Sequence, residues 1–324
     1  MRGAAGQELR RRVVTSYLLL VVSLLLVDQL WSPSEEAIGE LIFISDTDSV
    51  DAGRDSNSVY RIGTDGRGMK RIVGSIPHGD GYLRTTDIDC ERASQQLVIA
   101  SHRHDLNGFH HSLLDGSLLH LDEPKTGEPL TALREIALAS DGAGVLVSRE
   151  YGEHSPPRFG LASGDLMNRL FTSIKLPTAE RSYVSPDWAP DGRRISYIIV
   201  EQAADARATY KLAVAKPDGS GERIIHESSW LMSDLTWSPD GAWLTAVIGA
   251  QVYTMLPDGS GLTRVTMHHT GATSPRWSPD GRWISFVAPS SYPGFLQLML
   301  LDTDGSGIRQ VANIRGAVVN GCWV

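Results

Sequence analysis

Short apolar segments recur along this chain, and turn-forming residues separate them. Examples are the runs 41–44, 97–100 and 145–147, with Asp-Gly and Pro-Asp-Gly sequences between such runs. Apolar runs of this length, bounded by Gly, Pro and Asp, are typical of β-strands joined by tight turns. The pattern therefore predicts an all-β fold.

The turns belong to a repeated unit. The segments 187–195, 236–244 and 276–284 align without gaps, and each contains Trp, then Pro-Asp-Gly, then an aliphatic residue seven positions after the Trp. Pro fixes φ and Asp-Gly supplies a tight turn, so the segment predicts a strand, a hairpin turn and a second strand. A second turn follows in each unit, at 217–221, 257–261 and 304–307. Each unit is therefore expected to hold four short strands.

Weaker copies of the unit lie upstream. The residues at the Trp position are 90, 138, 188, 237, 277 and 323, at spacings of 40 to 50 residues, which is the period of propeller blades. The first copy begins at its second strand, 41–45, whereas 321–324 is a first strand with nothing after it. The sequence predicts a six-bladed β-propeller with four antiparallel strands per blade, closed by the C-terminal strand pairing with the N-terminal blade.

These repeats resemble the WD-like repeats of the TolB family of six-bladed propellers, over about residues 38 to 324. The resemblance implies a binding scaffold of the periplasm or the extracellular space. We expect no counterpart of the α/β domain that precedes the propeller in TolB, because only a linker-length stretch separates an apolar N-terminal segment from Leu41.

That N-terminal segment has the features of a targeting sequence. Arg10, Arg11 and Arg12 precede 13–27, an apolar run interrupted only by Thr15, Ser16 and Ser23 among small polar residues. A basic region followed by a short apolar region predicts a signal peptide or a signal-anchor. We therefore expect a targeting segment at 1–34 and a propeller at 35–324, located in the periplasm, on the cell surface or secreted. Membrane anchoring and cleavage both stay open.

Charge argues against one class of partner, and cysteine content against one class of fold. The chain has 30 basic and 38 acidic residues, and its formal net charge of −8 argues against nucleic-acid binding, which needs a basic surface. The two cysteines, Cys90 and Cys322, are too few for a disulfide scaffold. A bridge between them is conceivable on neighbouring first strands. We expect none, because packed blades rarely bring such Cα atoms within about 7 Å.

The two ends of each blade differ in their connections. The turns between strands one and two and between strands three and four are tight and lie at one end, here called the turn face. Longer and more variable loops lie at the opposite end, the loop face, where binding usually resides on a rigid scaffold. Tyr82, Tyr183 and Trp230 are the aromatic candidates for binding there.

Acidic residues recur three and one positions before the Trp position, on the strands that line the channel of a propeller. They are Asp87, Asp89, Glu135, Asp187 and Asp234, and Arg276 is the one basic residue in the set. Such side chains either accept hydrogen bonds from the backbone of the neighbouring blade or hold a calcium-type cation through Asp87, Asp89, Asp187 and Asp234. Without a cation, like-charge proximity should raise some of their pKa values.

Histidines gather around one hairpin. His102, His104, His110 and His111 are candidates for a zinc or manganese site if their imidazoles meet across it. The sequence contains none of the common nucleophile, zinc-protease or nucleotide-binding motifs. The favoured function is a non-catalytic extracytoplasmic scaffold that binds a protein or peptide through its loop face. The alternative is a metal-assisted lyase or hydrolase that acts on an extracellular polymer.

Overall fold

The computed structural model describes residues of one compact unit, Gly39–Val324. The described residues are 39–46, 57–74, 76–78, 81–91, 96–103, 106–113, 118–121, 133–152, 156–165, 170–203, 207–266, 271–289, 296–304, 307–312, 314 and 318–324. The predicted targeting segment lies outside them, so it stays a prediction. Within the described ranges, no helix has the length and apolarity to cross a membrane.

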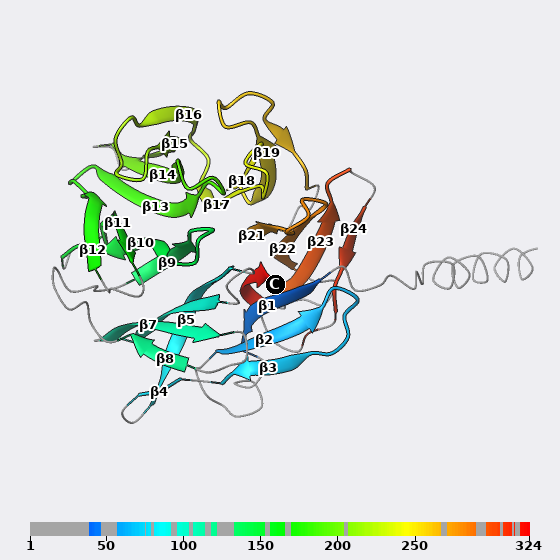
Figure 1. The fold of residues 1–324 in the computed structure, drawn as a ribbon. Coiled ribbons are helices and arrows are strands. Elements are labelled where there is room, and N and C mark those ends of the chain that lie inside the picture. Colours follow the sequence, from blue (N-terminus) through cyan, green and yellow to red (C-terminus); the bar gives the residue numbers. More distant parts are fainter. Residues whose placement is uncertain are drawn as a thin grey trace, which may run out of the picture. The chain divides into compact units, whose positions relative to one another are not determined.

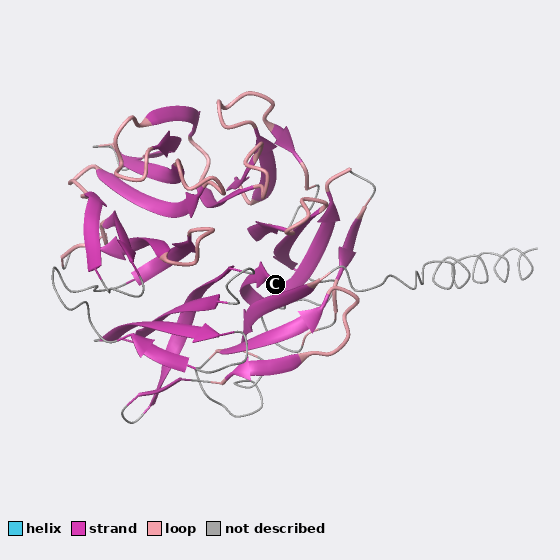
Figure 2. Ribbon diagram, in the orientation of Figure 1, coloured by secondary structure: helices cyan, strands magenta, loops and turns pink. Residues whose placement is uncertain are grey.

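The described chain is built from antiparallel β-sheets, which Figure 2 shows in one colour. Each sheet is named here after its inner strand, the strand that contacts the inner strands of the neighbouring sheets. The β25 sheet contains β25 (Val318–Trp323), β1 (Glu40–Ser45), β2 (Ser58–Gly63) and β3 (Lys70–Val73). The β5 sheet contains β4 (Ile76–His78), β5 (Gly81–Glu91), β6 (Gln96–Arg103), β7 (Leu106–Leu113) and β8 (Leu118–Leu121).

The remaining sheets each have four strands. The β9 sheet contains β9 (Leu133–Leu138), β10 (Gly144–Glu150), β11 (Phe159–Asp165) and β12 (Leu170–Lys175). The β13 sheet contains β13 (Arg181–Trp188), β14 (Ile195–Gln202), β15 (Ala208–Ala215) and β16 (Arg223–Ser228). The β17 sheet contains β17 (Met232–Trp237), β18 (Leu244–Ile248), β19 (Gln251–Met255) and β20 (Thr263–Arg264). The β21 sheet contains β21 (Thr273–Trp277), β22 (Trp283–Pro289), β23 (Leu296–Asp302) and β24 (Ile308–Gln310).

Figure 1 shows the sheets arranged around a common centre, as in a β-propeller. The predicted all-β propeller with four-stranded antiparallel sheets is thus confirmed. The C-terminal strand β25 pairs antiparallel with β1, with Leu41 opposite Trp323 and Phe43 opposite Gly321. Strands far apart in the sequence therefore share one sheet.

The Pro-Asp-Gly turns form for local reasons. Gly192, Gly241 and Gly281 have φ values of 65°, 69° and 70°, a conformation that favours glycine. The preceding carboxylate also fixes the turn, since Asp191 Oδ1 accepts a hydrogen bond from the backbone N–H of Arg193 at 2.9 Å. These turns hold the tryptophan-bearing end of each inner strand beside the start of the next strand.

The core consists of apolar clusters between successive sheets. Strand β1 supplies two of them, because alternate residues face opposite sides of a strand. Leu41 and Phe43 pack with residues of the β21 sheet, and Ile42 and Ile44 pack with residues of the β5 sheet. Corresponding clusters lie between the other neighbouring sheets, so each pair of sheets shares buried apolar surface.

Cys90 on β5 and Cys322 on β25 form a disulfide, with a Cα–Cα distance of 5.8 Å. The expectation that packed blades would keep these residues apart was wrong. Neighbouring sheets converge at their inner strands, where both cysteines lie, so the Cα atoms approach more closely there than the general spacing of packed sheets indicates. The bridge connects the β25 and β5 sheets covalently.

Candidate functional site

The acidic residues of β5 connect two sheets by hydrogen bonds. Asp87 Oδ2 accepts a bond from the backbone N–H of Ile136 on β9 at 2.8 Å, and Asp89 Oδ2 accepts one from Leu138 N–H at 2.7 Å. The other oxygen of each carboxylate accepts the N–H of the residue that follows it, at 3.0 Å. Asn320 on β25 also donates from its side-chain amide to Asp87. The two carboxylates therefore fix the β5/β9 junction.

The next inner strands repeat this arrangement with one adjustment. Asp187 on β13 accepts its own neighbour's N–H at 2.9 Å and Trp237 N–H of β17 at 2.7 Å. Glu135 bonds to Ser185 N–H at 2.6 Å instead of residue 186. Residue 186 is proline and has no N–H, so the longer glutamate side chain reaches the preceding amide. Asp234 accepts the Ser233 hydroxyl at 2.6 Å and makes no such inter-sheet bond in the described chain.

Asp87, Asp89, Glu135 and Asp187 thus accept hydrogen bonds from the backbone of the neighbouring sheet, which was one of the two predicted roles. The described residues also contain no group of three or more His, Cys, Asp or Glu side chains placed to hold a metal ion. The predicted calcium site at Asp87, Asp89, Asp187 and Asp234 gains no support from this geometry, because backbone N–H groups already bond to both oxygens of Asp87, Asp89 and Asp187.

The structure brings three of the predicted channel residues into one small cavity. Asp89, Asp187 and Arg276 line an opening of about 250 Å³, together with Trp188 and Trp237. Asp87, Glu135 and Asp234 do not line it. Arg276 donates from Nη1 to the carbonyl of Pro275 at 3.1 Å. Burial acts against the charge of Arg276, but the nearby carboxylates prevail and raise the pKa of its guanidinium.

Burial dominates the electrostatics of the acids. It raises the pKa of Asp87 to about 8, against the attraction of Arg276 and the Ile136 N–H bond. Burial, followed by the charge of Asp89, raises the pKa of Asp187 to about 7. The raised pKa values were predicted, but like-charge repulsion is a secondary cause and desolvation of the carboxylate is the main one.

On the loop face, Trp230 and Leu231 form an exposed apolar pair between β16 and β17. Their side chains are 70% and 59% exposed. The indole lies against Gly249 in the β18–β19 turn, where an added Cβ would be 3.5 Å from the ring. The carbonyl of Leu231 accepts the N–H of Gly249 at 2.9 Å. The exposed pair is therefore held on a defined turn.

The other two aromatic candidates do not join Trp230. Tyr183 is only 7% exposed and packs edge-on against Tyr197, with 6.0 Å between ring centroids. Its prediction as a binding residue gains no support from this burial, because residue 183 belongs to strand β13 and faces the core between the β9 and β13 sheets. Tyr82 lies on β5, and its side chain is outside the described part.

The histidine cluster is only partly described. His104 lies outside the described residues, as do the side chains of His102, His110 and His111. The β6–β7 register pairs His102 with Asn107, and pairs His110 and His111 with Ile99 and Val98. The backbone register therefore does not align the histidines with one another.

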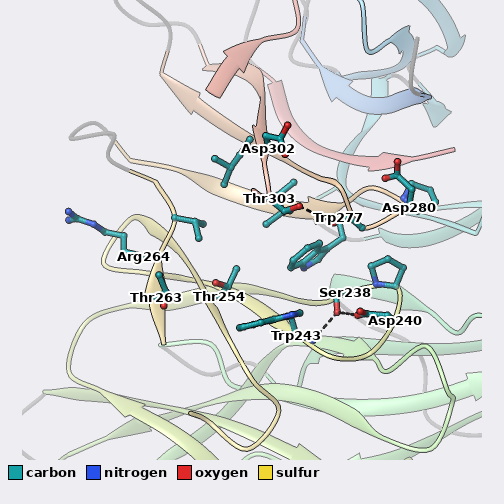
Figure 3. A pocket seen from close by; sticks show the side chains of 16 residues that line it. Ser238, Asp240, Trp243, Thr254, Thr263, Arg264, Trp277, Asp280, Asp302 and Thr303 are labelled. Carbon is teal, nitrogen blue, oxygen red and sulfur yellow. Dashed lines mark hydrogen bonds between the residues drawn. The ribbon is translucent and has the colours of Figure 1, made fainter. Parts of the chain in front are cut away.

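A larger cavity, of about 760 Å³, lies between the β17 and β21 sheets on the turn face, a position that sequence reasoning missed (Figure 3). Trp243 and Trp277 line it from the two sheets, and Asp240, Asp280 and Asp302 are the acidic lining residues. The available sequence signal was Trp243 itself, since the equivalent position in the preceding unit is Arg194.

Comparison with known proteins gave structural matches alone. No model of a protein family matches the sequence, and no curated protein matches it. TolB from Acinetobacter baumannii superposes with a TM-score of 0.67 at 14% identity, over 92% of this chain and 69% of that chain. A chain of a nidogen/laminin complex gives 0.64 at 10% identity, over 88% and 98%. Oligogalacturonate lyase in complex with manganese gives 0.51 at 12% identity, over 86% and 82%.

These superpositions establish the fold. At identities of 10–14% they do not establish the function. The chain is a β-propeller. Its fold is TolB-like, as the resemblance of its repeats predicted.

Proposed function

We propose that this protein is a non-catalytic propeller scaffold that binds a protein or peptide partner through its loop face. The observation that carries the proposal is the exposed pair Trp230 and Leu231. Large aromatic side chains on rigid supports are the usual anchors of protein interfaces. The contact of Trp230 with Gly249 supplies such a support.

The architecture that presents this face is proposed to be a closed ring of six blades. The inner strands contact one another in the order β25, β5, β9, β13, β17, β21 and back to β25. The pairing of β25 with β1 and the apolar cluster between the β21 and β25 sheets support closure.

The protein is proposed to work outside the cytoplasm. The Cys90–Cys322 disulfide supports this location, since such bonds persist in oxidising compartments. The basic and apolar residues before position 28 supply the matching targeting signal, as a signal peptide or as a membrane anchor. Protease added to spheroplasts should digest the protein, and complete protection would contradict this location.

The proposal that the scaffold is non-catalytic rests on the hydrogen bonds of the acidic channel residues. Asp87, Asp89 and Asp187 each place both oxygens on backbone N–H groups of two sheets. Carboxylates in such a role connect strands. The lyase or hydrolase alternative receives no specific observation from the described residues.

The test is a cross-linking capture with the full chain as bait in envelope extracts of its source cells. Trp230→Ala should reduce capture of the partner at least tenfold, because it removes the apolar anchor. Met69→Ala is the matched control, since Met69 is an exposed apolar residue in the β2–β3 turn on the opposite face. Equal capture by Trp230→Ala and the unchanged protein would contradict the proposal, as would a selective loss in Met69→Ala.

A further inference from the structure

We infer that the cavity between the β17 and β21 sheets binds a guanidinium group, carried by an arginine of a peptide or by a small guanidinium compound. This site lies on the turn face, so it does not rest on the proposed function of the loop face.

At the β13/β17 junction, the chain places its own guanidinium in the equivalent position. Arg194, which lies just before β14, has its Cζ 4.6 Å from the centre of the Trp237 ring. Its Nη2 is 3.5 Å from Asp191 Oδ2 in the same Pro-Asp-Gly turn. The indole of one sheet and the turn aspartate of the neighbouring sheet therefore act together on one planar cation.

At the β9/β13 junction, the equivalent position is glycine and the space is closed. A Cβ added to Gly144 would lie 3.1 Å from the Cβ of Ala139 and 3.7 Å from the Trp188 ring. The backbone itself packs near the indole there. At these two junctions, the position therefore holds a cation of the chain in one case and close backbone packing in the other.

The β17/β21 junction has neither. Trp243 replaces the arginine, is 37% exposed, and lines the 760 Å³ cavity together with Trp277. In Figure 3 the Trp277 indole lies above the Trp243 indole in the lining of this cavity. Two aromatic walls suit a planar cation, because guanidinium groups stack on aromatic faces.

The charge of the lining favours a cation as well. Three aspartates and Arg264 line the cavity, and in Figure 3 the Arg264 side chain points away from both indoles. Asp240 is the equivalent of Asp191. Hydrogen bonds from the Ser238 hydroxyl and Ala242 N–H lower the pKa of Asp240, so it is ionised at neutral pH. A guanidinium ligand would therefore meet the same pair of groups that Arg194 meets.

The test is titration of the full-length protein with guanidinium probes, with binding measured by calorimetry and by tryptophan fluorescence. The probes are N-acetyl-arginine amide, a short peptide with a central arginine, and agmatine. The same peptide with citrulline is the control, since citrulline keeps the planar shape and lacks the charge. We expect the arginine peptide to bind at least tenfold more tightly than the citrulline peptide. Agmatine and the arginine peptide distinguish a small cation from a peptide side chain.

Trp243→Arg is the decisive variant, because it reproduces the arrangement of Arg194 and fills the cavity with the chain's own guanidinium. It should abolish binding of the arginine peptide and leave the melting temperature unchanged or higher. Asp240→Asn serves if that variant does not fold, and should weaken binding at least fivefold. Trp230→Ala, on the loop face, should bind as the unchanged protein does. Equal affinity for both peptides, no binding of any probe, or unchanged binding by Trp243→Arg would overturn the inference.

Discussion

The β5/β9 and β17/β21 junctions use the same positions of the repeat but are held together differently. At β5/β9, Asp87 and Asp89 both bond to backbone N–H groups of the next inner strand. At β17/β21, Thr236 replaces the second acid and residue 275 is a proline without an N–H. Among the described residues, no hydrogen bond joins those two inner strands, although Asp234 attracts Arg276.

Both junctions nevertheless contain a buried apolar cluster. Val98 and Ile136 belong to the cluster at β5/β9, and Val252 and Phe286 belong to the cluster at β17/β21. Apolar packing is therefore common to the two, whereas the inter-sheet hydrogen bonds are a local addition. Of the two, the junction without these bonds is the one that contains the cavity of about 760 Å³.

Removing the Cys90–Cys322 disulfide, which links the β25 and β5 sheets, should cause the largest loss of stability. The Cys90–Cys322 bridge spans 232 residues. For a loop of this size, we expect the free energy of unfolding to fall by about 2–5 kcal/mol when both cysteines become serine. Thermal unfolding with and without reductant measures the loss. The double variant is the control, because reductant should not change its melting temperature. An unchanged melting temperature of the native protein, after thiol labelling proves reduction, would show that the bridge contributes nothing.

The second prediction compares the loss of stability caused by one substitution at the β5/β9 junction and one at the β17/β21 junction. Asp89→Ala leaves the N–H groups of Cys90 and Leu138 without their acceptor and should cost about 2–3 kcal/mol. Thr236→Val at the other junction should cost less than about 0.5 kcal/mol, since it keeps the shape of the side chain. Chemical denaturation gives both values, and hydrogen exchange should accelerate at Leu138. Equal losses in the two variants would remove the distinction between the junctions.

The acids of the bonded junctions should also make stability depend on pH. The folded-state pKa values of about 8 for Asp87 and about 7 for Asp187 lie above 3.8, so the folded protein holds more protons between these limits. The contribution of these two acids to stability is therefore greatest near pH 4 and falls as the pH rises toward 8, by at most about 1.4 kcal/mol per pH unit for each acid. Melting curves from pH 4 to 9 measure this fall.

Asp187→Asn is the variant that assigns the pH dependence. It cannot ionise, so the decline between pH 4 and 7 should become shallower, even if the variant is less stable at every pH. A decline of unchanged slope would assign the titration to other groups.

The smallest effect comes from converting one junction into the other. Thr236→Asp places a carboxylate at the position of Asp187, within the same register, beside the counter-charge of Arg276. It should accept the backbone N–H of Trp277 and stabilise the fold by about 1 kcal/mol. A rise of a few degrees in melting temperature is expected at neutral pH. A fall in melting temperature would mean that burial of the new charge outweighs the hydrogen bond.

The strands and turns were predictable from sequence because their causes are local. Pro-Asp-Gly determines its own turn, and the incomplete units at 41–45 and 321–324 indicated which strands would pair. The hydrogen bonding of Asp87 was also anticipated as one of two interpretations. Its alternative, a cation, depends on which donors surround the carboxylate, and those donors come from a strand 49 residues away.

The missed features depend on how sheets meet. Tyr183 was placed in a loop because the start of β13 has no turn signal, and its burial depends on packing against Tyr197. The disulfide depends on how closely inner strands converge. The cavity depends on Trp243 standing where Arg194 stands one unit earlier, a difference that acquires meaning only once the facing tryptophans are known.

The pairing of β1 with β25 also bears on the order of events during folding. Leu41, Ile42, Phe43 and Ile44 are fully buried, yet β25, one of the two strands that pair with β1, begins only at Val318. A growing chain therefore presents an apolar strand with an unpaired edge until β25 has been synthesised, and such edges promote aggregation. Contacts of this sequence separation also form slowly. Productive folding of this protein accordingly requires that this edge of strand β1 stays free of other strands until β25 pairs with it.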